Sequence, residues 1–321
     1  MKDAWGRTIE YVRLSLTDAC NFCCPYCRPA EITPQSQHQL LSVDEWMTIL
    51  GAFHQVGVKA VRLTGGEPLL YPHIEELLAR IKQTGWFEDI SMTTNGSLLA
   101  PRAAKLKELG LNRVNISLDS LDSDAFALCV GKANQLDSVL NGIQSAIDAG
   151  FTSVKINTVL SRHWTDDEVH DLLTYVETWP VIWRFIEYMP FQGDAFHGPT
   201  FDEWKAQLER VSGGILTENH DVYGFGPATY YNLPSGKEIG FIFSMSHSYC
   251  DTCNRVRLTS DGQMRLCLLR DDEADLVFLV RRGLSETELA SHIEWALQRK
   301  QERHDGVTMD QPERPMWRIG G

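Results

Sequence analysis

The sequence contains no long apolar run. None of its 321 residues falls in a stretch that approaches the roughly 20 consecutive apolar residues of a membrane-spanning helix. The opening MKDAWGRTIEYVRLS also lacks the apolar core of a secretion signal. We therefore expect a cytoplasmic protein without a membrane partner. In that reducing compartment, clustered cysteines indicate metal or redox chemistry rather than disulfides.

Basic residues are scarce. The chain has 30 lysines and arginines against 43 aspartates and glutamates, which gives a net charge of −13. This balance argues against nucleic acid as a bulk partner, because phosphate binding needs a basic face. The segment 250–270 departs from it, with four arginines against two aspartates. A solvated pair of basic strands would explain that segment, but beside a cysteine cluster we favour a site for an anionic substrate.

A glycine-rich fingerprint is missing after the first predicted strand, which argues against an open dinucleotide-binding sheet. Strand patterns occur at 12–16, 58–63, 90–93, 113–118, 154–159 and 183–187, with helical patterns between them. Six such units in a row predict an α/β fold with a parallel sheet and right-handed crossovers. Six units fall short of the eight of a complete barrel, so we expect a partial, open-sided (βα)6 barrel of the TIM type.

The composition changes near residue 190. The segment FQGDAFHGPTF is loop-like, and 195–275 has the pattern of a short helix followed by strands and turns. We expect two domains: a partial barrel at 1–190, and a smaller α+β domain at 191–321 that ends in Gly320-Gly321. Capping boxes predict three helix starts, at Ser42 with Glu45, Thr165 with Glu168, and Ser285 with Glu288.

Six of the eight cysteines form two triplets of three rather than four ligands. The first consists of Cys20, Cys24 and Cys27, and the second of Cys250, Cys253 and Cys267. Three thiolates cannot saturate a four-coordinate metal or a four-iron cluster, so each site is predicted to keep one position open. No histidine occurs between residues 1 and 37, which disfavours zinc at the first triplet.

Two residues are candidate fourth ligands. Cys23 directly adjoins a cysteine of the first triplet, so its side chain would point away, and we interpret it as a non-ligand. His247 lies close to the second triplet in sequence. The spacing of that triplet fits three-quarters of a zinc ribbon or an iron–sulfur site, and leaves both open. Cys129, in the apolar segment FALCVG, is predicted to be a buried structural thiol.

Polar residues follow the predicted parallel strands at their carboxyl ends, the face where barrel enzymes build their active sites. The turn Thr64-Gly65-Gly66-Glu67-Pro68 follows the second strand, and Thr93, Ser117 and Met189 end later ones. A Gly-Gly pair alone is usually just a turn. Here it follows a parallel strand and faces a cysteine triplet, so we favour close contact between the backbone and a ligand.

Basic residues also fall inside predicted strands, at Arg13, Arg62, Lys155 and Arg184. A charge inside a barrel strand is costly unless it is paired or faces a polar interior. A single one would indicate an ion pair. Four of them, together with Arg255 and Arg257, predict a pocket for a polyphosphate or another polyanion.

With these residues in place, the chain resembles the radical S-adenosylmethionine (SAM) superfamily. Within it, the sequence is similar to the GTP 3′,8-cyclase family of molybdenum cofactor biosynthesis. The likeness runs from WGRTIEYVRLSLTDACNFCCPYC through RLTGGEPLL, VNISLDSLD and RFIEYMP to CDTCNRVRLTSDGQMRLCL and the terminal Gly-Gly. The first cysteine motif alone would give only the superfamily. The second triplet, its arginines and the di-glycine tail make the narrower match.

This resemblance implies SAM and two 4Fe–4S clusters as cofactors. The first triplet would hold the cluster whose open iron chelates the amino and carboxylate groups of SAM. The second triplet would hold a cluster in the C-terminal domain whose open iron contacts guanine. The implied SAM-binding residues are Tyr26, Gly65, Gly66, Glu67, Ser117 and Met189.

The implied substrate is GTP. Its binding residues would be Arg13, Arg62, Thr93, Lys155, Arg184, Arg255, Val256 and Arg257. The implied catalytic residues are Arg255, Arg257, Arg265, Gly320 and Gly321, the last two on a tail that reaches into the active site. As a lyase, the family removes the C3′ hydrogen of GTP with a 5′-deoxyadenosyl radical, and the C3′ radical attacks C8. The product is (8S)-3′,8-cyclo-7,8-dihydroguanosine 5′-triphosphate, at the first step of molybdopterin synthesis. An electron donor such as flavodoxin or ferredoxin, and a second copy in a homodimer, are implied partners.

Four residues depart from the family pattern: Ala19, Cys23, Tyr71 and Lys132 occupy places where arginine or another basic residue is common. The cluster cysteines and most GTP positions are intact, so the reaction class is unchanged. The alternative substrate is a peptide or another small molecule, used by a divergent radical SAM enzyme with an auxiliary cluster. A non-catalytic, zinc-binding interaction module is a third hypothesis.

Overall fold

A wall of six parallel strands forms the centre of the molecule. The computed structural model describes residues 1–27, 40–190, 198–221, 223–303, 314 and 316–320. The strands are β1 (Tyr11–Ser15), β2 (Ala60–Thr64), β3 (Asp89–Thr94), β4 (Arg113–Ser117), β5 (Ser153–Val159) and β6 (Ile182–Ile186). They pair in sequence order and in parallel. The six predicted strands are confirmed, with each end displaced by no more than two residues.

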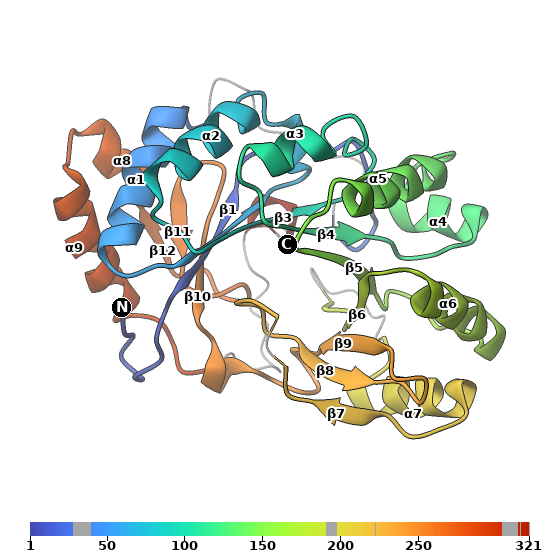
Figure 1. Cartoon of the computed structure of the whole chain (residues 1–321). Coiled ribbons are helices and arrows are strands. Elements are labelled where there is room, and N and C mark those ends of the chain that lie inside the picture. Colours follow the sequence, from blue (N-terminus) through green and yellow to red (C-terminus); the bar gives the residue numbers. More distant parts are fainter. Residues whose placement is uncertain (28–39, 191–197, 222, 304–313, 315, 321) are drawn as a thin grey trace.

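Helices cover the outer face of this curved wall (Figure 1). They are α1 (Val43–Gln55), α2 (Ile74–Thr84), α3 (Ala103–Glu108), α4 (Ser123–Val130), α5 (Leu136–Asp148) and α6 (Asp166–Thr178). The capping boxes predicted for α1 and α6 are present, with both the side-chain and the backbone hydrogen bond of each motif. Short 3₁₀ turns lie at η2 (Pro68–Leu70) and η3 (Cys250–Thr252).

Residues beyond 190 extend both edges of the same sheet. Their strands are β7 (Thr217–Asn219), β8 (Thr229–Asn232), β9 (Glu238–Ile242), β10 (Arg255–Leu258), β11 (Gln263–Arg265) and β12 (Glu273–Asp275). Within the described part of the chain, the strand order is β12-β11-β10-β1-β2-β3-β4-β5-β6-β9-β8-β7. β10 pairs in parallel with β1, and β9 pairs in parallel with β6. The C-terminal segment therefore lengthens the barrel wall at both open ends, and the predicted domain boundary at 190 stays a prediction.

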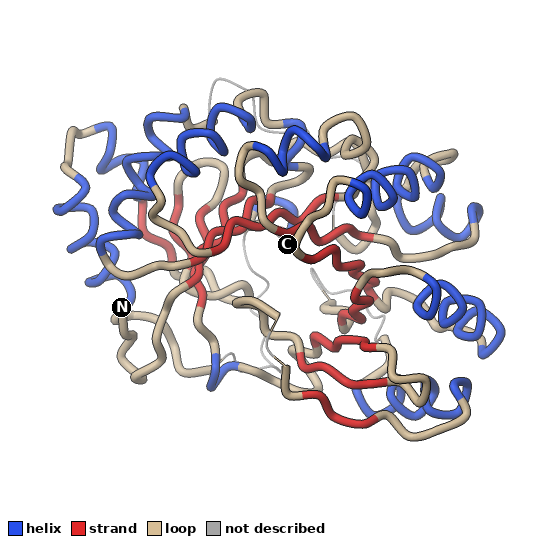
Figure 2. Tube along the Cα trace, viewed as in Figure 1, coloured by secondary structure: helices blue, strands red, loops and turns tan. Residues whose placement is uncertain are grey.

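Three more helices belong to this segment: α7 (Phe201–Ser212), α8 (Leu276–Arg281) and α9 (Glu286–Leu297). The capping box predicted for α9 is confirmed, and α7 has another at Thr200 with Glu203. Figure 2 shows the strands as a curled wall with the helices outside it. None of the helices in the described segments has both the length and the apolarity to cross a membrane.

The two faces of the wall differ in chemistry. On β1, Val12 and Leu14 are fully buried against the helix layer, whereas Arg13 between them lines an interior cavity. Alternation in a parallel strand is unusual, because both faces are normally apolar. It shows that the inner face of this sheet is built for a polar occupant. The C-terminal end of the chain returns to this interior through η4 (Met316–Arg318), near the centre of Figure 1.

Candidate active site

The first cavity lies at the carboxyl ends of the central strands. The loop after β1 brings the first cysteine triplet to it, and the turn after β2 adds Gly65 and Gly66. Other strand ends and the tail supply Thr93, Asn95, Ser117, Asp119, Asn157, Met189 and Met316. The sequence-predicted SAM residues therefore meet in one cavity, apart from Glu67.

Both glycines pack against the backbone of the cysteine loop. A Cβ on Gly65 would lie 2.5 Å from the Thr17 carbonyl oxygen, and one on Gly66 would lie 2.4 Å from that of Ala19. Gly65 also has a φ of +148°, which L side chains rarely adopt. The Gly66 and Glu67 amides donate to the Thr17 and Ala19 oxygens at 2.7 and 2.8 Å. The Gly-Gly pair thus fixes the cysteine loop, while the same turn lines the cavity.

Tyr26 and Asp119 form a buried pair on one side of this cavity. The Tyr26 hydroxyl donates to Asp119 Oδ2 at 2.7 Å, and the Val159 amide donates to the other oxygen at 2.8 Å. Burial raises the pKa of Asp119 to about 6, although both hydrogen bonds oppose this shift. Burial together with Asp119 raises the pKa of Tyr26 well above its ordinary value.

Glu67 is turned away from the cavity. Its carboxylate accepts hydrogen bonds from Thr94 Oγ1 at 2.7 Å, the Asn95 amide at 2.8 Å and the Leu69 amide at 3.1 Å. Burial raises the pKa of Glu67 to about 7 against these donors. The side chain joins the β2 turn to the end of β3, so its predicted contact with a cofactor stays a prediction.

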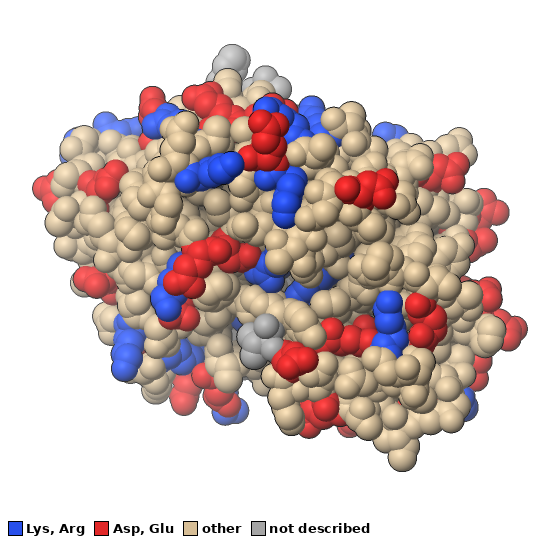
Figure 3. All heavy atoms as spheres, in the orientation of Figure 1, with Lys and Arg blue, Asp and Glu red and all other residues tan. Residues whose placement is uncertain are grey.

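The second cavity is lined by the other cysteine triplet and by arginines. Cys250 and Cys253 reach it from η3, and Cys267 reaches it from the loop after β11. The basic residues around it are Arg13, Arg62, Arg184, Arg255, Arg257 and Lys300. Val256 also lines it. Figure 3 shows basic atoms at the floor of a hollow in this face of the molecule, while acidic and basic residues are mixed elsewhere on it.

These cations influence one another strongly. Burial lowers the pKa of Arg257 to about 10, and nearby Arg255 adds to this effect. Burial, then Arg257, lowers the pKa of Arg13 well below its ordinary value. Arg184 is 2% exposed and donates to Asn157 Oδ1 and to Asn115 Oδ1 at 2.8 Å, which orients it without neutralising it. The pocket therefore holds positive charge that a polyanion would compensate.

Lys155 and Arg265 were predicted in this site but lie beside it. The Lys155 ammonium donates to the Tyr223 oxygen at 2.9 Å and to the Tyr230 hydroxyl at 3.1 Å. Burial, then Arg184, lowers the pKa of Lys155 to about 6. The side chain of Arg265 is 0% exposed and pairs with Asp271 and Glu273. Their predicted roles toward substrate stay predictions, and Gly321 lies outside the described residues.

The two cavities adjoin. They share the lining residues Thr93, Asn157, Ile186 and Met189. Thr93 Oγ1 is buried and has no hydrogen-bond partner among the described residues. A buried hydroxyl without a partner is costly, so its place on the shared wall fits a ligand that spans both cavities.

Gly320 occupies the arginine side of this chamber. Its carbonyl oxygen accepts from Arg257 Nη1 at 2.7 Å and from Arg13 Nη2 at 3.1 Å. Gly320 has a φ of +69°, and a Cβ there would lie 2.4 Å from Thr64 Oγ1. Only glycine suits this position without a shift in the tail.

The surroundings of the two cysteine triplets affect their thiols in different ways. Burial, then Cys27, raises the pKa of Cys24 well above its ordinary value, so these thiols share a small apolar space. At Cys253 burial opposes ionisation, but Lys300 and Arg255 lower the pKa. Across the described segments, no three His, Cys, Asp or Glu side chains form a group that could hold a metal ion. A cluster does not need that convergence, because each cysteine binds a different iron.

The residues that depart from the family pattern make contacts with nearby parts of the fold. Tyr71 is 1% exposed and donates to the Leu41 oxygen at 2.9 Å. The Lys132 ammonium lies 3.5 Å from the Asn21 oxygen of the cysteine loop. The Cys23 amide donates to the Val130 oxygen at 2.9 Å, and its Cβ packs close to Gly131. Cys23 is not among the residues that line the two cavities, and its interpretation as a non-ligand stays a prediction.

Sequence reasoning missed several lining residues. Lys300 follows α9 and donates to the Leu266 oxygen, and Tyr249 lies below the Arg255 guanidinium at 5.2 Å. Met316 comes from the tail. No motif marks Lys300 or Met316. Tyr249, directly before the second triplet, could have been proposed from that proximity.

Family comparisons agree with this site. The radical SAM superfamily model matches residues 14–176, and the molybdenum cofactor synthesis C model matches residues 181–306. The chain belongs to the radical SAM superfamily. GTP 3′,8-cyclases from Pelotomaculum thermopropionicum and Moorella thermoacetica are each 39% identical to it, over the full length of both chains. The enzyme of that name from Trichodesmium erythraeum is 42% identical, over 98% of this chain and 99% of its own. The chain therefore belongs, more narrowly, to the GTP 3′,8-cyclase family.

A solved structure confirms the fold. SuiB of Streptococcus suis, bound to S-adenosylmethionine, matches with a TM-score of 0.62 and 16% identity. The match covers 84% of this chain and 64% of that one. Together with the family assignment, it bears out the predicted partial barrel. Membership of the superfamily implies a 4Fe–4S cluster and SAM, to which the thiol-lined cavity corresponds.

Proposed function

We propose that this protein is a lyase that cyclises GTP to (8S)-3′,8-cyclo-7,8-dihydroguanosine 5′-triphosphate, at the first step of molybdopterin synthesis. One observation carries the proposal: a thiol-lined cavity and an arginine-lined cavity share a wall at Thr93, Asn157, Ile186 and Met189. A radical formed in the first cavity could then reach a substrate held in the second without crossing water. The relatives that match over their full length bear the name of this activity.

In the first cavity, the chain's task is to hold the cofactors. Cys20, Cys24 and Cys27 would ligate a cluster and leave one iron for SAM. The Gly65-Gly66 backbone and Ser117 line this cavity and would contact SAM, and the Tyr26–Asp119 pair closes one side. When bound, these groups supply a carbon-centred radical that removes a hydrogen atom. The buried surroundings would protect that radical from water.

In the second cavity, the chain's task is to position the nucleotide. The guanidinium groups of Arg13, Arg62 and Arg257 line this cavity and would form bidentate hydrogen bonds with phosphate oxygens. Cys250, Cys253 and Cys267 would hold a second 4Fe–4S cluster with an open iron toward guanine. Fixing both ends of GTP would hold C3′ near the shared wall and C8 within reach of C3′.

The remaining partners are part of the same proposal. An electron donor such as flavodoxin or ferredoxin would supply the low-potential electron. We also propose a cytoplasmic location, which keeps the cluster thiols reduced, and assembly as a homodimer.

Anaerobic turnover tests the proposal. The protein is reconstituted with iron and sulfide, then given SAM and dithionite, and 5′-deoxyadenosine is measured with and without GTP. We expect GTP-dependent formation with GTP consumed and the cyclised nucleotide detected by mass spectrometry. Slow formation of 5′-deoxyadenosine that does not depend on GTP would instead support the alternative substrate, a peptide or another small molecule. Zinc in place of iron and sulfide would contradict the radical mechanism.

A further inference from the structure

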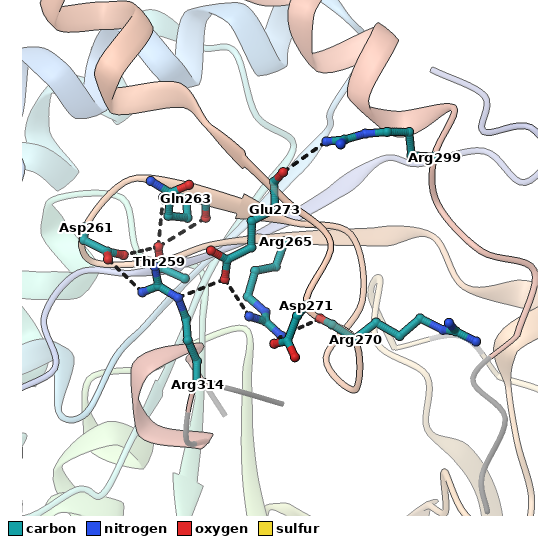
Figure 4. Close-up of polar contacts among 9 residues, drawn as sticks. All are labelled: Thr259, Asp261, Gln263, Arg265, Arg270, Asp271, Glu273, Arg299 and Arg314. Atoms are coloured by element: carbon teal, nitrogen blue, oxygen red, sulfur yellow. Dashed lines mark hydrogen bonds and ion pairs between the residues drawn. The ribbon is translucent and has the colours of Figure 1, made fainter. Parts of the chain in front are cut away.

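An ionic cluster outside both cavities holds the C-terminal tail. Arg314 donates from Nη1 to Asp261 Oδ2 at 2.7 Å and from Nε to Glu273 Oε1 at 2.9 Å (Figure 4). The three side chains are between 20% and 34% exposed, so solvent screens them only in part. Arg314 is six residues before Gly320, whose carbonyl oxygen reaches into the arginine-lined cavity. The pairing therefore fixes the tail at its entry to the active site.

Burial of Asp261 would raise its pKa, but the hydrogen bond from Thr259 and the pairing with Arg314 hold that pKa below its ordinary value. The Thr259 hydroxyl sits in the turn between β10 and β11 and accepts from the Gln263 amide at 2.9 Å. The carboxylate that receives Arg314 is therefore preorganised by its own turn. Preorganised partners lose less entropy on pairing, which makes this contact worth more than an average surface ion pair.

The second carboxylate is shared. Glu273 Oε1 accepts from Arg314 and also from Arg265 Nη1. Arg265 in turn binds the loop 266–272 through Nη2, which donates to the Arg270 carbonyl oxygen and to Asp271 Oδ1 at 3.0 Å. This loop carries Cys267, the third thiol of the second triplet. In Figure 4 the Arg270 side chain points away from the cluster, while its carbonyl oxygen accepts from Arg265.

We propose that Arg314 and Arg265 are positioning residues joined through Glu273. Arg314 seats the tail so that Gly320 meets Arg13 and Arg257, and Arg265 shapes the loop that presents Cys267. Because both use the same carboxylate oxygen, seating of the tail and order in the Cys267 loop are coupled. Arg265 would then act indirectly, through Glu273 and the loop that carries Cys267, in place of direct catalysis. The consequence for turnover rests on the proposed function, but the coupling itself does not.

Hydrogen–deuterium exchange on the full chain measures that coupling without substrate. The variants are R314Q, D261N and E273Q, and the matched control is R210Q. Arg210 pairs with Asp166 at 2.6 Å on the outer helices and takes no part in either cavity. Exchange is followed in the peptides covering 316–320 and 266–272, before and after cluster reconstitution.

We expect D261N to speed exchange of the tail by about tenfold or more, the effect of losing one charge-assisted hydrogen bond. R314Q loses two such bonds and should speed exchange at least as much. D261N should speed exchange in 266–272 less than E273Q does, because Asp261 acts on that loop only through Arg314 and Glu273. E273Q should speed exchange in both segments, since it weakens both arginine contacts. R210Q should change neither.

Tail exchange at the wild-type rate in both R314Q and D261N would overturn the proposal, as would a loop that stays protected in E273Q. If E273Q lowers the melting temperature and speeds exchange throughout the chain, the D261N result still decides the role of Arg314. Steady-state kinetics add a second readout: R314K, which keeps the charge, should recover part of the kcat that R314Q loses. If the variants behave as expected in exchange while no GTP turnover is seen even in wild type, the proposed function fails and the tail coupling stands.

Discussion

At the scale of single residues, the least expected feature is a backbone carbonyl placed among buried arginines. Arg13 and Arg257 lie opposite each other on neighbouring strands, where their charges repel. The Gly320 oxygen accepts from both and so offsets part of that repulsion. A phosphate oxygen would do the same more strongly, because it carries charge. The Gly320 carbonyl therefore holds both guanidinium groups in the cavity that we propose for the triphosphate.

Replacement of Arg257 tests this assignment. R257A should weaken GTP binding by roughly 30- to 1,000-fold, about 2–4 kcal/mol, because it removes a buried cation from a phosphate site. Binding can be measured by equilibrium dialysis under anaerobic conditions. Guanosine, which has no phosphates, should lose affinity by less than about threefold, and R210A should bind GTP like wild type. An equal loss for guanosine would place Arg257 at the base rather than at the phosphates.

Gly320 should tolerate no side chain. G320A should lower kcat by at least about tenfold, because the new Cβ would meet Thr64 Oγ1 and displace the carbonyl from both arginines. The matched control is G213A. Gly213 has a φ of +76°, close to that of Gly320, but nothing lies within 4 Å of a Cβ there. G213A should therefore show only the backbone strain of about 1–2 kcal/mol in unfolding, with kcat unchanged. Similar kcat values for G320A and wild type would show that the tail is not needed in this position.

At the scale of elements, the sequence was most informative where local signals were strong. The capping boxes of α1, α6 and α9 and the six parallel strands were all predicted, because caps and apolar runs act through near neighbours. That the polar residues at the carboxyl ends of the strands lie close together followed from the parallel topology alone. Glu67 could not be resolved in this way, because its residue type predicts a polar contact but not its direction. Its partners on β3 become neighbours only through the fold.

The turn after β2 yields a prediction at this scale. G66A should lower the free energy of unfolding by about 1–3 kcal/mol, since its Cβ would force the Ala19 carbonyl away and break the contact between turn and cysteine loop. Urea denaturation measures the loss, and iron analysis after reconstitution should show reduced loading of the first cluster. G85A is the control for iron loading. Gly85 has a φ of +63° and nothing lies within 4 Å of a Cβ there, so G85A should show backbone strain in unfolding but full iron loading. Full iron loading in G66A would contradict the role given to this turn.

At the scale of the whole molecule, closure of the active site depends on contacts that no local pattern contains. The pairing of β10 with β1 joins residues more than two hundred positions apart, and it sets Arg257 beside Arg13. Likewise, Arg314 pairs with Asp261 and Glu273, which lie more than forty positions earlier in the sequence. The sequence could predict a basic pocket from the composition of strands and of segment 250–270. It could not predict that Lys155 would be turned toward Tyr223 and Tyr230, because these partners come from a distant segment. The partners of Arg265 are Asp271 and Glu273 in the same segment, but their spacing alone does not distinguish an ion pair from a contact with substrate.

The buried Lys155, which lies beside the chamber, should make the free energy of unfolding depend on pH. Burial and the surrounding arginines lower the pKa of Lys155 to about 6, so at pH 8 this amine is neutral in the folded protein. The unfolded chain binds a proton there up to a pKa of about 10.4. Because the unfolded state holds more protons across this window, the free energy of unfolding should rise with pH, by at most about 1.4 kcal/mol per pH unit from this group. K155M should flatten that rise, whereas K107M, at a half-buried position of α3 outside both cavities, should leave it unchanged.

A bound polyanion reverses the shift, because negative charge near Lys155 favours its protonated form. GTP binding at pH 8 should therefore take up protons, at a pH where the phosphates, with a pKa near 6 for a monoester, are already ionised. Calorimetry in two buffers of different ionisation enthalpy measures the uptake, which should reach a substantial fraction of one proton in wild type and K107M. In K155M it should fall close to zero. Equal uptake in K155M and wild type would show that another group takes up the proton. It would also show that the bound nucleotide does not affect the protonation of Lys155.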